Sequence, residues 1–115
     1  MVHRHAKEKG YSVDLFYTNV EGEAINRIYR AVDEGFNGLV MNPAGFSYAG
    51  YALKDCIKGA GLPNVEIHIS NIHKRGINCV LSDVSEGVIT GFGVHGYVLA
   101  LEAILHLLNE RAKAR

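Results

Sequence analysis

Apolar and polar side chains alternate one by one in Val65-Glu66-Ile67-His68-Ile69-Ser70. This alternation predicts a strand over residues 65–69, with Glu66, His68 and Ser70 on one face. Polar groups on a strand buried between helices are costly unless they bond to each other or to a ligand. A carboxylate beside an imidazole can favour its protonated form and prepare it for general acid work. The stretch is therefore either a functional site or a satisfied structural network.

Strands and helices alternate along the rest of the chain. Strands are expected over residues 12–17, 38–41 and 87–92, and helices over residues 21–34, 48–60 and 95–112. Asn19 is the expected N-cap of the first of these helices. The alternation predicts an α/β fold with a parallel sheet, in one domain spanning residues 1–115.

Residues 1–10 are charged and end in Gly10. Basic residues followed by glycine are typical of the last turns of a helix. A doubly wound fold normally has something before such a helix, so the first strand is expected to be missing from these residues. In that case residues 12–17 and 38–41 lose the strand between them, and either they pair across the gap, another chain fills it, or the chain is marginally stable.

Composition excludes several classes of function. Twelve basic and twelve acidic residues cancel, which argues against a nucleic-acid binder. No apolar run approaches the length of a membrane span, and no signal peptide is recognisable. Cys56 and Cys79 show no ligand spacing and are interpreted as two thiols. We expect no metal, no cofactor and a cytoplasmic location.

Three other features point to the carboxyl edge of the sheet, where ligands bind in open α/β folds. Asn42 follows a strand and either contacts a ligand or simply forms a turn with Pro43. His73 lies in a loop and is expected to be solvated. Residues 91–96 match GxGxxG, but no later strand could carry the acidic ribose partner, so a tight strand-to-helix crossing explains the glycines better than a dinucleotide does.

Several segments together resemble the type II 3-dehydroquinate dehydratases. The most specific is residues 65–73, Val-Glu-Ile-His-Ile-Ser-Asn-Ile-His, and the Asn-Pro-Ala-Gly turn at residues 42–45 precedes it. Further agreement comes from residues 19–23, 51–55, 87–93 and 96–102. The resemblance covers nearly the whole chain.

This resemblance implies a flavodoxin-like three-layer α/β/α fold and the anti elimination of water from 3-dehydroquinate, a step of the shikimate pathway, without metal or cofactor. It implies that His68 is the general acid that protonates the departing hydroxyl and that Glu66 is its partner. Substrate contacts are implied for Asn42, Ile69, Ser70, Asp55 and Tyr48, with Asp55 reaching a neighbouring subunit's site. It also implies a homo-oligomer, a dodecamer built from trimers.

The chain departs from the family pattern in its base half. The lid tyrosine and arginine have no counterpart in these residues, and Tyr48 stands where a histidine is usual. The loop after His73 is shorter than usual and lacks the substrate-binding arginine expected there, since Arg75 matches an earlier loop arginine instead. Little turnover is therefore expected. Two alternatives stay open: a non-catalytic paralogue that binds a small hydroxylated acid or serves as an oligomer subunit, and a flavodoxin-like nucleotide binder, which is weaker because the first βα turn has no phosphate loop.

Overall fold

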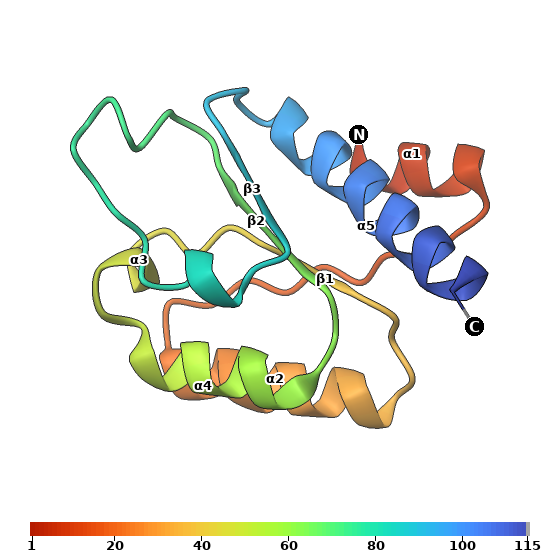
Figure 1. Ribbon diagram of the computed structural model, residues 1–115, viewed down its shortest axis with the longest axis horizontal. Helices are drawn as coiled ribbons and strands as arrows, with labels where there is room; N and C mark the ends of the chain where they lie inside the picture. Colours follow the sequence, from red (N-terminus) through yellow and green to blue (C-terminus); the bar gives the residue numbers. More distant parts are fainter. Residues whose placement is uncertain (115) are drawn as a thin grey trace.

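The computed structural model describes residues 1–114, which form a parallel sheet between two layers of helices (Figure 1). The predicted α/β architecture is confirmed. The elements in chain order are α1 (Val2–Lys9), α2 (Glu21–Asp33), β1 (Leu39–Met41), α3 (Phe46–Ala49), α4 (Tyr51–Ala60), β2 (Asn64–His68), the short 3-10 helix η1 (Ser82–Val84), β3 (Gly87–Thr90) and α5 (His95–Lys113).

The sheet has the order β1-β2-β3, with both pairs parallel. Val40 lies opposite Val65, and Ile67 lies opposite Ile89. Because all strands run the same way, the residues that follow Met41, His68 and Thr90 meet at one edge of the sheet. This is the edge at which the sequence predicted a site.

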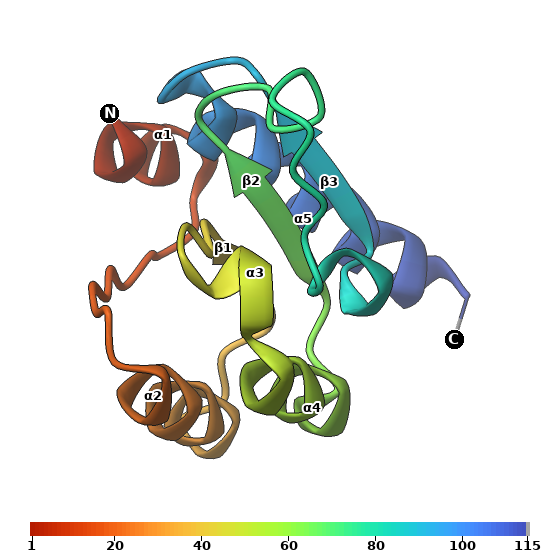
Figure 2. The ribbon, with the colours of Figure 1, turned by 90° about the vertical axis from the view of Figure 1, so that its left-hand side faces the viewer.

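The central strand β2 is buried along its whole length, because helices cover both faces of the sheet. Val65 and Ile67 pack against α5 in one apolar cluster. The other cluster joins α2 and α4 through Ile28, Leu53 and Ile57. Figure 2 shows α2 and α4 together on one side of the sheet and α1 and α5 on the other.

The prediction of a strand over residues 12–17 is wrong. The segment runs beside the sheet without joining it, and residues 12–19 make no backbone–backbone hydrogen bond to any other described residue. A strand exists only where a neighbour completes its ladder, so the strand-forming composition of this segment is not sufficient. Leu15, Phe16 and Tyr17 are exposed as a result.

The helix expected over residues 48–60 is divided into α3 and α4 at Gly50. A Cβ at Gly50 would lie 2.6 Å from the carbonyl oxygen of Phe46, so the close backbone contact at the break requires glycine. Asn19 is not the N-cap of α2. That helix begins after Val20, whose N–H is bonded by the Thr18 hydroxyl.

The prediction of a helix ending at Gly10 within residues 1–10 is confirmed. Helix α1 ends at Gly10 in the left-handed conformation, with Lys7 and Lys9 in its last turn, and it packs on α5. Among the described residues, no helix is long and apolar enough to span a bilayer.

Candidate active site

A cleft of about 300 Å³ opens at the carboxyl edge of the sheet. The turn after β1, the end of β2 and the loop that follows β2 form its walls. Five residues expected from the sequence line it together: Asn42, Tyr48, His68, Ile69 and Ser70. The structure also adds Arg75, which the sequence did not single out as a site residue.

His68 and Glu66 form a buried pair at the base of the cleft. Nε2 of His68 lies 2.6 Å from Oε2 of Glu66, and the two residues are 4% and 1% exposed. A carboxylate can only accept, so the ring nitrogen is the donor. This fixes the orientation of the imidazole and leaves Nδ1 as the nitrogen available to a ligand. The arrangement suits a general acid or base whose ring is held by a carboxylate.

Glu66 is itself held by hydroxyl groups of the segment that leads into β3. The Ser82 hydroxyl donates to both carboxylate oxygens, at 3.1 and 3.0 Å. Ser85 lies 3.5 Å from Oε1, and its hydroxyl also receives the Asn64 amide at 3.0 Å. These contacts satisfy a buried carboxylate and fix its position behind His68. Sequence reasoning missed Ser82 and Ser85 because neither lies in a recognisable motif.

The loop after β2 presents donors to the cleft. The backbone N–H groups of Ile69 and Ser70 have no hydrogen-bond partner among residues 1–114. Arg75 Nη1 donates to the Ser70 hydroxyl at 3.1 Å, which brings a guanidinium to the same wall. Two backbone donors, a hydroxyl and a guanidinium form a group suited to a carboxylate ligand.

Both polar atoms of the Asn42 side chain form hydrogen bonds within the chain. Its Nδ2 donates to the Tyr97 hydroxyl at 3.1 Å, and its Oδ1 accepts from the Ala44 N–H at 3.3 Å. Ala44 takes a φ of 46° in this turn, a strained value for a residue with a Cβ. Asn42 therefore shapes the turn, which was one of the two expectations from the sequence, and still lines the cleft.

Tyr48 and Asp55 differ in their relation to the cleft. Tyr48 lies at its mouth and is 62% exposed. Asp55 does not line the cleft and is exposed on α4. His73 is exposed, as expected for a solvated loop residue.

Cys79 lies close to the Glu66–His68 pair. The ligand atoms of the three side chains lie within 4.8 Å of one another, so among the described residues this is the set that could hold a metal ion. Burial raises the pKa of the Cys79 thiol, which keeps it protonated near neutral pH. Cys56 and Cys79 are both free thiols. The sequence predicted the thiols but not the contact, because the path of the loop after β2 sets it.

The glycines of residues 91–96 make a tight strand-to-helix crossing. Gly91 and Gly93 have φ values of 97° and 61°, and the N–H of Gly93 donates to the carbonyl of Ile69 at 2.9 Å. The crossing thereby supports the loop that presents the two free N–H groups. A Cβ at Gly91 would lie 3.1 Å from Cβ of Asn71.

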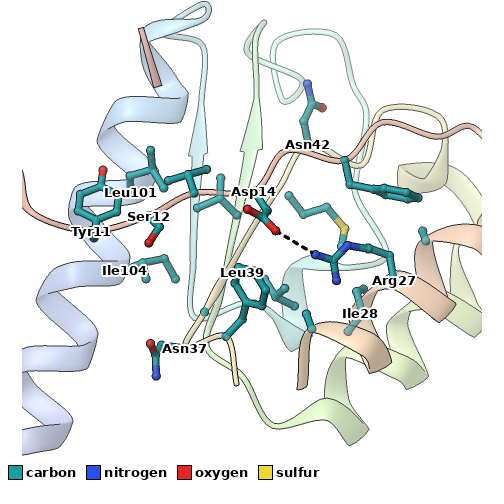
Figure 3. A pocket seen from close by; sticks show the side chains of 18 of the residues that line it. Tyr11, Ser12, Asp14, Arg27, Ile28, Asn37, Leu39, Asn42, Leu101 and Ile104 are labelled. Atoms are coloured by element: carbon teal, nitrogen blue, oxygen red, sulfur yellow. Dashed lines mark hydrogen bonds and ion pairs between the residues drawn. The ribbon is translucent and has the colours of Figure 1, made fainter. Parts of the chain in front are cut away.

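A second cavity of about 330 Å³ lies on the other side of β1 (Figure 3). Residues 11–18, α2, β1 and α5 surround it. Its lining is mainly apolar, and it contains none of the predicted catalytic residues. Only Asn42 lines both this cavity and the cleft.

The fold and the cleft define a flavodoxin-like α/β protein with a carboxylate-held histidine at the carboxyl edge of its sheet. The family model described as "Dehydroquinase class II" matches residues 1–105. The chain therefore belongs to the class II dehydroquinase family, as the resemblance predicted.

Curated relatives and solved structures agree with this assignment. The chain is 40% identical over 116 aligned positions to a "3-dehydroquinate dehydratase" of Thermotoga neapolitana, covering 98% of this chain and 78% of the relative. A protein of the same name from Helicobacter hepaticus is 42% identical, with 93% and 70% covered. The type II dehydroquinase structure from Butyrivibrio crossotus superposes with a TM-score of 0.85 at 30% identity, covering 90% of this chain and 74% of that one. The Propionibacterium acnes enzyme gives a TM-score of 0.82 at 32% identity, with 90% and 72% covered.

Proposed function

We propose that the cleft binds 3-dehydroquinate and that the chain is a hydro-lyase acting on it. The observation that carries the proposal is the Glu66–His68 pair beside the unpartnered N–H groups of Ile69 and Ser70. The names of the relatives support the choice of substrate. In this proposal the carboxylate of the substrate binds the two N–H groups and the Ser70 hydroxyl, with Arg75 beside them.

His68 is the proposed general acid. Elimination removes a proton from C2 and the hydroxyl from C1, and the hydroxyl leaves as water when His68 supplies a proton. Glu66 accepts a hydrogen bond from Nε2–H and so keeps the ring turned with Nδ1 toward the cleft. As general acid, the doubly protonated ring gives its Nδ1 proton to the departing hydroxyl and becomes neutral. Positioned proton transfer of this kind contributes about 10²–10⁴-fold to a rate.

The group that would take the C2 proton is less well held than His68. Tyr48 is the tyrosine that lines the cleft, and it is largely exposed. Its phenol is not held by a hydrogen bond to another described residue. We therefore expect the 115-residue chain to turn over well below the ordinary range of about 1–10³ per second.

The test measures binding and turnover separately on the purified chain. Calorimetry with 3-dehydroquinate reports binding, and the absorbance of the enone product reports turnover. We expect His68→Ala to lower turnover by about 10²–10⁴-fold while binding changes little, and Tyr48→Phe to abolish any residual turnover. Equal rates for the original chain and His68→Ala would contradict the assigned role. Tight binding with no turnover in any form would favour a non-catalytic paralogue.

We also propose that the chain is a homo-oligomer, a dodecamer by resemblance to its family. Asp55 and Tyr51 are exposed on α4, which leaves that helix face open to another subunit. Sedimentation at micromolar concentration tests this, and a monomer alone would contradict it. The cytoplasmic location stays a prediction.

A further inference from the structure

Three chemically different metal ligands meet at the base of the cleft. They are a carboxylate oxygen of Glu66, a ring nitrogen of His68 and the sulfur of Cys79, and the three atoms lie within 4.8 Å of one another. Nε2 of His68 is already 2.6 Å from Oε2 of Glu66. Around a tetrahedral zinc ion, ligand atoms of these kinds stand about 3.3–3.6 Å apart. Small movements of the side chains would therefore bring all three atoms to one cation.

The charges of this set favour a divalent cation. Glu66 is 1% exposed, and among the ion pairs of residues 1–114 its partner is His68, with no lysine or arginine beside it. A buried carboxylate is costly unless a positive charge compensates it. Burial raises the pKa of the Cys79 thiol, and the Glu66 carboxylate beside it raises it further. A thiol that coordinates a metal loses its proton outright, so one carboxylate and one thiolate together neutralise a charge of +2.

The surroundings hold these ligands in place and leave a path to them. The Ser82 hydroxyl donates to both oxygens of Glu66, which is the kind of outer contact that orients a metal ligand. The carbonyl of Ser47 accepts from the Val80 N–H at 2.9 Å and so fixes the residue next to Cys79. His68 and Ser47 both line the cleft, which gives a cation its entry path. Three protein ligands leave the fourth tetrahedral position to water.

We infer that Glu66, His68 and Cys79 bind a zinc-like divalent cation, which takes the place of the proton between His68 Nε2 and the carboxylate. The thiolate selects Zn²⁺, or Co²⁺ as its spectroscopic substitute, over Mg²⁺ and Ca²⁺, which prefer oxygen ligands. This departs from the expectation of no metal. Ligand spacing could not predict the site, because Cys79 reaches the pair through the loop after β2, which contains no regular element before η1. The inference does not depend on the proposed catalytic activity.

Titration of the purified chain with Co²⁺, in the absence of thiol reagents, tests the site. A cobalt–thiolate bond adds a charge-transfer absorption in the near ultraviolet that nitrogen and oxygen ligands do not give. Cys79→Ser removes the thiolate with little change in size. Cys56→Ser is the matched control, because Cys56 is the other free thiol and lies in the apolar cluster of α2 and α4.

We expect the absorption in the original chain and in Cys56→Ser, its displacement by Zn²⁺ but not by Mg²⁺, and its loss in Cys79→Ser. Removing an outer contact of a metal ligand costs about 10–100-fold in affinity, so Ser82→Ala should weaken Co²⁺ binding by that factor and keep the absorption. Removing the ligand itself should cost about 100-fold or more. Equal Co²⁺ affinity in Cys79→Ser and the original chain would place the cation elsewhere and overturn the inference.

Alkylation of the original chain gives a second measurement that does not depend on how Cys79→Ser folds. Zn²⁺ should slow the reaction of Cys79 with iodoacetamide at least tenfold, followed by mass spectrometry of the peptide that contains it, because a coordinated thiolate is no longer free to react. Equal rates with and without Zn²⁺ would also overturn the inference.

Discussion

Replacing the buried carboxylate of Glu66 by an amide tests how the candidate site is held. Glu66 is 1% exposed, and its carboxylate accepts from His68 Nε2 at 2.6 Å and from the Ser82 hydroxyl at 3.0 Å. Glutamine has nearly the same size, so Glu66→Gln changes the charge and one acceptor while leaving the packing intact. The free energy of unfolding should fall by about 2 kcal/mol.

The magnitude follows from the two hydrogen bonds. A bond to a charged group contributes about 1.5–3 kcal/mol and a neutral one about 0.5–1.5, so each bond loses about 1 kcal/mol. The NH₂ group also turns a donor toward the hydroxyl or the ring, which raises the cost. The substitution also removes a buried charge, and the desolvation cost that it no longer bears acts in the opposite direction. The total loss therefore stays near 2 kcal/mol, below the cost of leaving a buried charge without its partner.

Urea denaturation measures the effect, with Glu86→Gln as the matched control. Glu86 is the exposed counterpart, 3.4 Å from Arg111, with both side chains more than two fifths exposed. Such a pair contributes about 0–1 kcal/mol. We expect the midpoint to fall by about 1 M for Glu66→Gln and little for Glu86→Gln, with unchanged slopes. If the two midpoints coincide, the cost of burying the carboxylate offsets its hydrogen bonds and the reasoning fails.

Three further predictions concern residues that line the cleft or lie behind its buried pair. Arg75→Ala should weaken binding of 3-dehydroquinate by about 10–100-fold in calorimetry, whereas Lys74→Ala, an exposed neighbour, should not. The Cys79 thiol, whose pKa burial raises, should react with iodoacetamide more slowly at pH 8 than a free thiol of pKa about 8.5; an equal rate would contradict its burial. Ala44→Gly should raise the free energy of unfolding, measured by urea denaturation, by up to about 1 kcal/mol because it relieves the positive φ, and a loss of stability would show that the turn is unstrained.

The polar strand face was predictable from the sequence because period-two geometry is local. Glu66 and His68 lie two residues apart, so their contact follows once β2 forms. Ser82 and Cys79 could not be predicted in the same way. Their approach depends on the path of residues 69–81, which contain no regular element, and no periodicity predicts such a path.

Residues 12–17 show where local sequence preference gives a wrong prediction. Val13, Leu15 and Phe16 have the composition of a strand, and an apolar period is a reliable local signal. A strand also needs a hydrogen-bonding neighbour, and the nearest one across the cavity, β1, does not pair with it. Local preference therefore fails where the pairing that would make a strand is not formed.

Asn42 connects the two hollows of the molecule. It lines both the cleft and the cavity of Figure 3, and its Nδ2 bonds Tyr97 on α5 while its Oδ1 accepts from Ala44 in the turn. Asn42 therefore joins the wall of the cleft to α5 through a single side chain.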